Sequence, residues 1–137
     1  MHDRFGPRRA RGLSSEFLRT TGMILGKEPE GVVGIAINAM DDPQEVAEQI
    51  QGAVKKGRPG DGVIILTDMF GGTPSNVALS FLQDGRVEVI SGMNLPMILK
   101  AVEVRDGLDL TDIAGALKQS GRDNISLASD ILKGNGN

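Results

Sequence analysis

The stretch GVIILTDMFGGTPSN, residues 62–76, decides the expected fold. Its first half is an unbroken apolar run that ends in Asp68, which is typical of a strand covered on both faces in a parallel sheet. Its second half contains two glycines, a threonine and a proline, which favour a tight turn followed by a helix start. The stretch therefore predicts a strand joined to a helix at the carboxyl edge of a sheet, where α/β proteins bind their ligands.

Predicted strands and helices alternate along the rest of the chain. Helix-like periodicity favours helices at 14–25, 43–56, 74–82, 96–104 and 110–120, with Gly26, Gly57 and Gly121 as their C-terminal stops. Further strands are expected at 31–38 and 86–91, and a short strand-like piece at 124–129. Alternation of this kind indicates βαβ units, so the predicted fold class is α/β, an open, mainly parallel sheet with helices on both faces.

Composition excludes several classes of protein. A length of 137 residues predicts one main domain, and the formal charge of −3 argues against a nucleic-acid binder. The absence of cysteine excludes disulfides and thiolate metal sites. No apolar segment approaches the roughly 20 residues that cross a bilayer, and the basic N-terminus lacks the apolar core of a secretory signal. We therefore expect a cytoplasmic protein.

The first twelve residues, MHDRFGPRRARG, differ from all that follows. They contain four arginines and only one large apolar residue after Met1, so they do not predict a buried strand. We therefore expect an atypical basic segment at 1–12, a domain at 13–133 and a tail at 134–137.

The turn after Asp68 has the features of an anion site. Gly71 and Gly72 allow a tight turn and close approach of the backbone. Thr73 is expected as the helix N-cap, which leaves the amides of Ser75 and its neighbour Asn76 facing an anion, and phosphate is the expected one. The alternative is a capped strand-to-helix turn that binds nothing.

Two further groups are candidates at the same edge of the sheet. Asp68 has three readings that its sequence leaves open: it orients an imidazole, accepts a phosphoryl group itself, or bonds to loop amides. Met93 and Asn94 follow the next strand and either line the same crevice or form a capped turn with a core methionine.

Known nucleotide and metal motifs are absent from the sequence. It contains neither G-x-x-x-x-G-K-[ST] nor G-x-G-x-x-G. His2 is the single histidine, so the sequence predicts no His-based metal site and no Ser-His-Asp triad. We expect no cofactor.

Two segments resemble the signatures of a known family. ILTDMFGGTPSN, residues 65–76, and VEVISGMNLPMILK, residues 87–100, resemble those of the mannose-type enzyme IIA (EIIA type-4) family of the phosphoenolpyruvate-dependent sugar phosphotransferase system. LSSEFLRTTGMILG resembles the family's first helix and GRDNISLASDILKG its C-terminal end, so the resemblance covers residues 13–133.

The resemblance implies phosphoryl relay. In the family a histidine at the end of the first strand accepts phosphate from the phosphocarrier protein HPr, and passes it to a IIB partner or keeps it as a signal. The resemblance makes Asp68 the supporting acid, and it places the remaining candidates in a crevice beside it. These are the phosphate-binding Gly71, Gly72, Thr73 and Ser75, and the lining residues Met69, Phe70, Met93 and Asn94. It also implies a homodimer, in which C-terminal material crosses to the partner, and contact with the membrane only through a transporter complex.

The N-terminus departs from the family pattern. The acceptor histidine should fall at Ala10 or Arg11, and neither residue can take its place. Losing about six buried apolar side chains of the central strand removes on the order of 10 kcal/mol of burial. Three interpretations of the segment stay open. It is a wrong-frame translation, or it belongs to a degenerate paralogue, or it folds back so that His2 acts as the acceptor.

We expect the chain as written not to accept phosphate. Two alternative functions stay open: a regulatory binding module on the same fold that is not phosphorylated, and a receiver-like domain with Asp68 as phosphoacceptor. The receiver-like alternative lacks the lysine expected after a later strand, because VEVISG is not followed by one.

Overall fold

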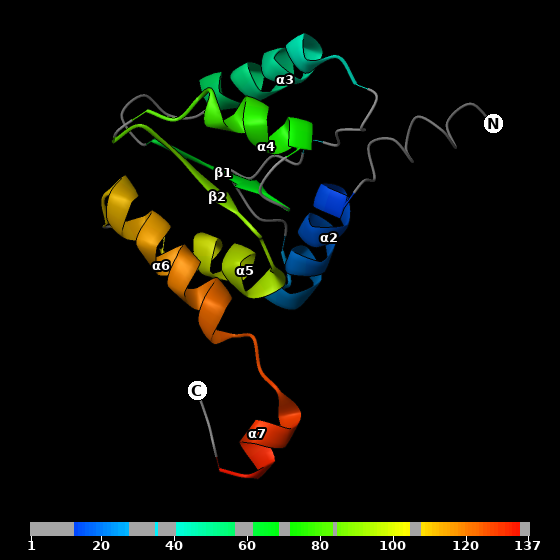
Figure 1. Cartoon of the computed structure of the whole chain (residues 1–137), viewed down its shortest axis with the longest axis vertical. Coiled ribbons are helices and arrows are strands. Elements are labelled where there is room, and N and C mark those ends of the chain that lie inside the picture. Colours follow the sequence, from blue (N-terminus) through cyan, green and yellow to red (C-terminus); the bar gives the residue numbers. More distant parts are fainter. Residues whose placement is uncertain are drawn as a thin grey trace, which may run out of the picture.

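The computed structural model describes residues 13–27, 35, 41–56, 62–68, 72–83, 85–104 and 108–134. Within these residues the sheet has two strands, β1 (Val63–Thr67) and β2 (Val87–Ser91). The helices, in chain order, are α2 (Leu13–Leu25), α3 (Pro43–Lys55), α4 (Gly72–Leu79), α5 (Leu95–Val104), α6 (Leu110–Asp123) and α7 (Ala128–Leu132) (Figure 1).

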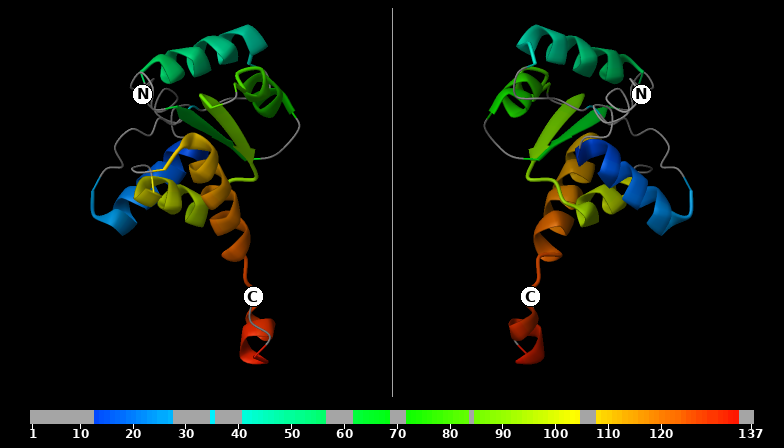
Figure 2. Two further views of the ribbon diagram at one scale, coloured as in Figure 1. Left: turned by 90° about the vertical axis from the view of Figure 1, so that its left-hand side faces the viewer. Right: turned by 90° about the vertical axis from the view of Figure 1, so that its right-hand side faces the viewer.

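The two strands are parallel, and helices cover both faces of the sheet. Their register runs from Val63 opposite Val87 to Thr67 opposite Ser91. Helices α3 and α4 lie on one face, and α2, α5 and α6 lie on the other (Figures 1 and 2). This arrangement confirms the predicted α/β class with a parallel sheet. The central strand expected within 1–12 and, apart from Ile35, the strand expected at 31–38 lie outside the described residues.

Buried apolar side chains form a layer on each side of the sheet. Val46 and Ile50 of α3 are buried against α4, whose Ala78 is fully buried. On the other face the core comes from α5 and α6, which pack on each other. Its buried side chains are Met97, Ile98, Ala114 and Leu117. The helix predicted at 43–56 is therefore confirmed, with Val46 and Ile50 on its buried face.

Capping carboxylates begin two of these helices. The Asp42 side chain accepts a hydrogen bond from the Gln44 amide at 3.3 Å, and Pro43 follows it as the first residue of α3. Asp109 accepts a hydrogen bond from the Asp112 amide at 2.9 Å at the start of α6. Such a cap satisfies one of the amides that a helix start leaves unpaired.

Predicted limits of two helices are wrong. Helix α4 runs from Gly72 to Leu79 and not from 74 to 82, so Thr73 is inside its first turn and is not its N-cap. Pro74 fits there because amides in the first turn of a helix donate to no carbonyl within the helix, so the missing N–H of proline costs no hydrogen bond. Helix α6 continues through Gly121 to Asp123, because Gly121 is buried where Met97 of α5 comes close, and there it serves packing, not termination.

The expected strand at 124–129 is also absent. Residues 125–127 have no regular structure and lead into the short helix α7. This part of the chain points away from the sheet in all three views (Figures 1 and 2), so β1 and β2 offer it no ladder partner. We call residues 125–133 the C-terminal arm.

Candidate functional site

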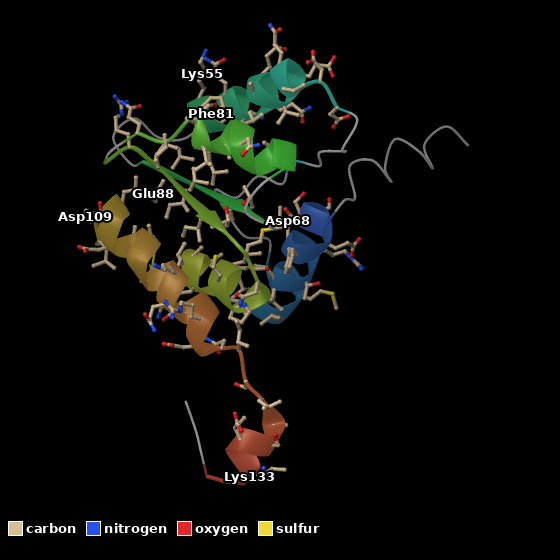
Figure 3. All side chains as sticks on the ribbon, in the orientation of Figure 1. Lys55, Asp68, Phe81, Glu88, Asp109 and Lys133 are labelled. Atoms are coloured by element: carbon tan, nitrogen blue, oxygen red, sulfur yellow. The ribbon has the colours of Figure 1, made fainter. Side chains whose placement is uncertain are left out.

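The carboxyl edge of the sheet carries the candidate site. Both strands end there, and Asp68, the residue after β1, is exposed. Figure 3 shows Asp68 beside the N-terminal turns of α2, and the views of Figures 1 and 2 agree that this end of α2 is next to the end of β1. A carboxylate and a helix N-terminus therefore lie at the same edge of the sheet.

Two more helices begin near the same edge. Helix α4 starts at Gly72, four residues after Asp68, and α5 starts at Leu95, four residues after the end of β2. The first amides of a helix have no partner within it and carry the positive end of its dipole, so they favour an anion. The starts of α4 and α5 and the Asp68 carboxylate therefore belong to the same edge of the sheet.

Hydrogen bonds join the ends of the two strands. The Thr67 hydroxyl donates to Ser91 Oγ at 2.9 Å, and the Met93 amide donates to the Thr67 carbonyl at 3.0 Å. Gly92, between Ser91 and Met93, has a φ of +84°, a conformation that glycine adopts readily. It turns the chain back toward β1. Neither Thr67 nor Ser91 was predicted as a site residue. Their signal in the sequence is a hydroxyl residue at the end of each of two adjacent parallel strands.

Asn94 connects two helices. Its side-chain oxygen accepts from the Met97 amide at 3.1 Å, which makes it the N-cap of α5. Its side-chain nitrogen donates to the Gly121 carbonyl of α6 at 2.9 Å. The capped-turn interpretation therefore describes Asn94, and Met93 beside it is half-buried. A role of either residue in lining a crevice stays a prediction.

The other predicted site residues are described only in part. Gly72, Thr73 and Ser75 lie in the first turn of α4, close in sequence to Asp68. Met69, Phe70 and Gly71 lie outside the described residues, as do the two positions expected for the acceptor, Ala10 and Arg11. The structure thus brings Asp68 and the start of α4 to one edge, and the predicted roles of these residues stay predictions.

Two features are absent from the part of the chain that the structure describes. No three His, Cys, Asp or Glu side chains gather there to hold a metal ion. No helix there has the length and apolar character to cross a membrane.

A family model described as the PTS system fructose IIA component matches residues 12–118. PTS denotes the phosphotransferase system. The chain belongs to this mannose/fructose-type IIA family. The match begins one residue after Arg11, so both positions expected for the acceptor histidine precede it.

Curated relatives agree with this family. The IIA chain is 31% identical over 115 residues to the PTS system fructose-specific EIIA component of Bacillus subtilis, and the match covers 83% of this chain and 78% of that protein. It is also 31% identical over 114 residues to the PTS system mannose-specific EIIAB component of Escherichia coli K12. That match covers 82% of this chain but 35% of the longer relative.

Solved structures of IIA proteins have the same fold. The phosphotransferase system component EIIA from Streptococcus agalactiae superposes with a TM-score of 0.74 at 29% identity, covering 85% of this chain and 89% of that one. The mannose/sorbose specific IIA subunit from Enterococcus faecalis gives 0.72 at 26% identity, covering 84% and 86%. The IIA family and its α/β fold therefore rest on sequence and structure together.

Proposed function

We propose that the chain has the role of a IIA component in a phosphoenolpyruvate-dependent sugar phosphotransferase system. In this role a IIA protein receives phosphate from HPr and passes it to a IIB partner or uses it as a regulatory signal. Residues 13–133 form the IIA domain, between the basic segment at 1–12 and the tail at 134–137. The work takes place in the cytoplasm, and a transporter complex provides its only contact with the membrane. The observation that supports this most is the family match over residues 12–118.

The arrangement of the carboxyl edge suits phosphoryl relay. An imidazole nitrogen attacks the phosphorus of phospho-HPr, the bond from phosphorus to HPr breaks, and the phosphoryl group moves to the imidazole. An imidazole restored at this edge donates a hydrogen bond from its other ring nitrogen to Asp68, which orients the ring. The first-turn amides of α4, in the segment with Gly71, Gly72, Thr73 and Ser75, bind the phosphate oxygens.

The chain as written lacks the nucleophile that this relay needs. Alanine has no reactive group at position 10, and the guanidinium of Arg11 stays protonated and is not a nucleophile. We infer that this polypeptide does not accept phosphate from phospho-HPr. The alternative function on the same fold is a regulatory binding module that is not phosphorylated.

Phosphoryl transfer separates these alternatives. The chain is incubated with enzyme I, HPr and labelled phosphoenolpyruvate, and a matched protein carries an apolar strand ending in His-Gly in place of residues 1–12. We expect acid-labile label only on the matched protein. Asp68→Asn in the matched protein should slow labelling by about tenfold or more, since the ring loses the acceptor that sets its tautomer.

Three results would change this proposal. Stoichiometric acid-labile label on the chain as written contradicts the loss of the acceptor. Absence of label on both proteins contradicts the IIA role. Binding of HPr by the chain as written, measured by calorimetry, supports the regulatory module, and absence of binding excludes it.

We also propose that the protein is a homodimer joined through the C-terminal arm. Four large apolar side chains of the arm are exposed: Ile125 by 71%, Leu127 by 62%, Ile131 by 56% and Leu132 by 87%. The arm points away from the rest of the chain (Figures 1 and 2), so its own domain does not cover these side chains. An exposed apolar surface of this kind is typical of contact with a second chain.

Light scattering during gel filtration tests the dimer. We expect twice the mass of one chain for the unaltered protein and the mass of one chain for the double variant Leu127→Asp/Ile131→Asp. Leu108→Asp is the control, because Leu108 is also exposed, by 49%, but lies before α6 and outside the arm. A monomeric unaltered protein, or a dimeric double variant, contradicts the proposal.

A further inference from the structure

We propose that Thr67 and Ser91 are positioning residues for the anion site. Their hydroxyl pair fixes the separation between the end of β1, which Asp68 follows directly, and the segment that leads from β2 into α5. The inference rests on the proposed function, because it assumes that the carboxyl edge binds phosphate.

The first support is the contact between the two side chains. Thr67 and Ser91 are the last register pair of the two strands, and the Thr67 hydroxyl donates to Ser91 Oγ at 2.9 Å. Thr67 is only 8% exposed, so water does not readily replace this acceptor. A buried hydroxyl without a partner is unfavourable, and the pair is therefore expected to stay closed.

The second support is a main-chain contact at the same residue. The Thr67 carbonyl accepts a hydrogen bond from the Met93 amide at 3.0 Å. Thr67 is thus held through its side chain and its main chain to two residues that flank the turn at Gly92. This turn leads directly into Asn94, the N-cap of α5.

The starts of α4 and α5 follow the hydroxyl pair closely in the sequence. Asp68 follows Thr67 directly and α4 begins four residues later, while α5 begins four residues after Ser91. No strand residue remains between the hydroxyl pair and the loops, so the pair is the last tertiary restraint within the sheet before the candidate site. Groups that bind one anion together need their spacing maintained to about 0.5 Å. Loss of the pair should therefore weaken anion binding more than it weakens the fold.

Four variants test the pair. Thr67→Val keeps the shape and removes the donor, Ser91→Ala removes the acceptor, and the double variant removes both without leaving an unpaired hydroxyl. Thr67→Ser keeps the hydroxyl and is the conservative rescue. Thr21→Val is the matched control, because Thr21 is a fully buried threonine whose hydroxyl donates to the Phe17 carbonyl within α2 at 2.7 Å.

Three quantities are measured. The affinity for inorganic phosphate is obtained from NMR shifts of the first-turn amides of α4. The other two are the hydrogen-exchange rate of the Met93 amide and the midpoint of unfolding. We expect Thr67→Val and Ser91→Ala to weaken phosphate binding about three- to tenfold and to speed Met93 exchange by a similar factor. Thr67→Ser should keep both values. The double variant should regain stability relative to Ser91→Ala but not affinity, and Thr21→Val should lower the midpoint and leave both other readouts unchanged.

The outcomes distinguish this inference from the proposed function. Unchanged phosphate affinity in Thr67→Val overturns the positioning role, as does a loss of affinity in Thr21→Val equal to that in Thr67→Val. If the unaltered protein binds no phosphate, the phosphate site of the proposed function fails. Hydrogen exchange of the Met93 amide then tests whether the hydroxyl pair restrains the turn after β2. Unchanged exchange in Thr67→Val overturns that restraint. Faster exchange in Thr67→Val that does not occur in Thr67→Ser supports it.

Discussion

The side-chain nitrogen of Asn94 donates a hydrogen bond to the main-chain carbonyl of Gly121, 27 residues further along the chain, at 2.9 Å. The other end of the same side chain accepts from the Met97 amide at 3.1 Å. One residue therefore begins α5 and joins it to the last turn of α6.

Asn94→Ala should destabilise the protein by roughly 2–3 kcal/mol, because it removes a helix cap and leaves the Gly121 carbonyl without its donor. Urea denaturation measures this loss. Asp42→Ala is the matched control, since Asp42 only caps α3, and its expected loss is about 1 kcal/mol. Equal losses in the two variants would mean that the contact with α6 contributes nothing.

Two glycines of α6 should respond differently to alanine. A Cβ at Gly115 meets nothing within 4 Å, so Gly115→Ala should stabilise the protein by about 1 kcal/mol through helix propensity. A Cβ at Gly121 would lie 2.7 Å from Met97 Cε, so Gly121→Ala gains the same propensity but must displace a buried side chain. We expect a smaller gain or a net loss by thermal unfolding. An equal gain at both positions would show that the Met97 side chain moves freely.

Leu117→Ala should cost about 2–5 kcal/mol, because Leu117 is fully buried and its truncation leaves a cavity between α6 and its neighbours. Leu108→Ala is the control, with an exposed side chain and an expected change within about 0.5 kcal/mol. The free energy of unfolding in urea measures both. A cost below 1 kcal/mol for Leu117→Ala would contradict its place in the core.

Arg11→His alone should not produce a phosphate acceptor. The residues before it, MHDRFGPRRA, contain neither the apolar alternation nor the length of apolar sequence that would place an imidazole at the edge of a buried sheet. The assay with enzyme I, HPr and labelled phosphoenolpyruvate should give no acid-labile label on this variant. Label at the level of the protein with a restored strand would show that position 11 alone limits transfer.

Local patterns predicted much of the fold. The apolar run of β1 and the Gly26 end of α2 were both predicted from neighbouring residues, since each reflects a backbone preference or burial within a few positions. The prediction for Gly121 was wrong because glycine also permits close packing, and the closeness of Met97 depends on how α5 and α6 pack.

The sequence by itself determined the order of β1, α4, β2, α5 and α6 and the presence of Asp68 after β1, because both follow from short-range patterns. It also determined that neither Ala10 nor Arg11 is a histidine. Only the tertiary structure decided that Asn94 bonds to Gly121, that Thr67 bonds to Ser91 across 24 residues, and that the C-terminal arm points away from the sheet. Partners distant in sequence depend on how whole elements pack, and no local pattern of side chains carries that information.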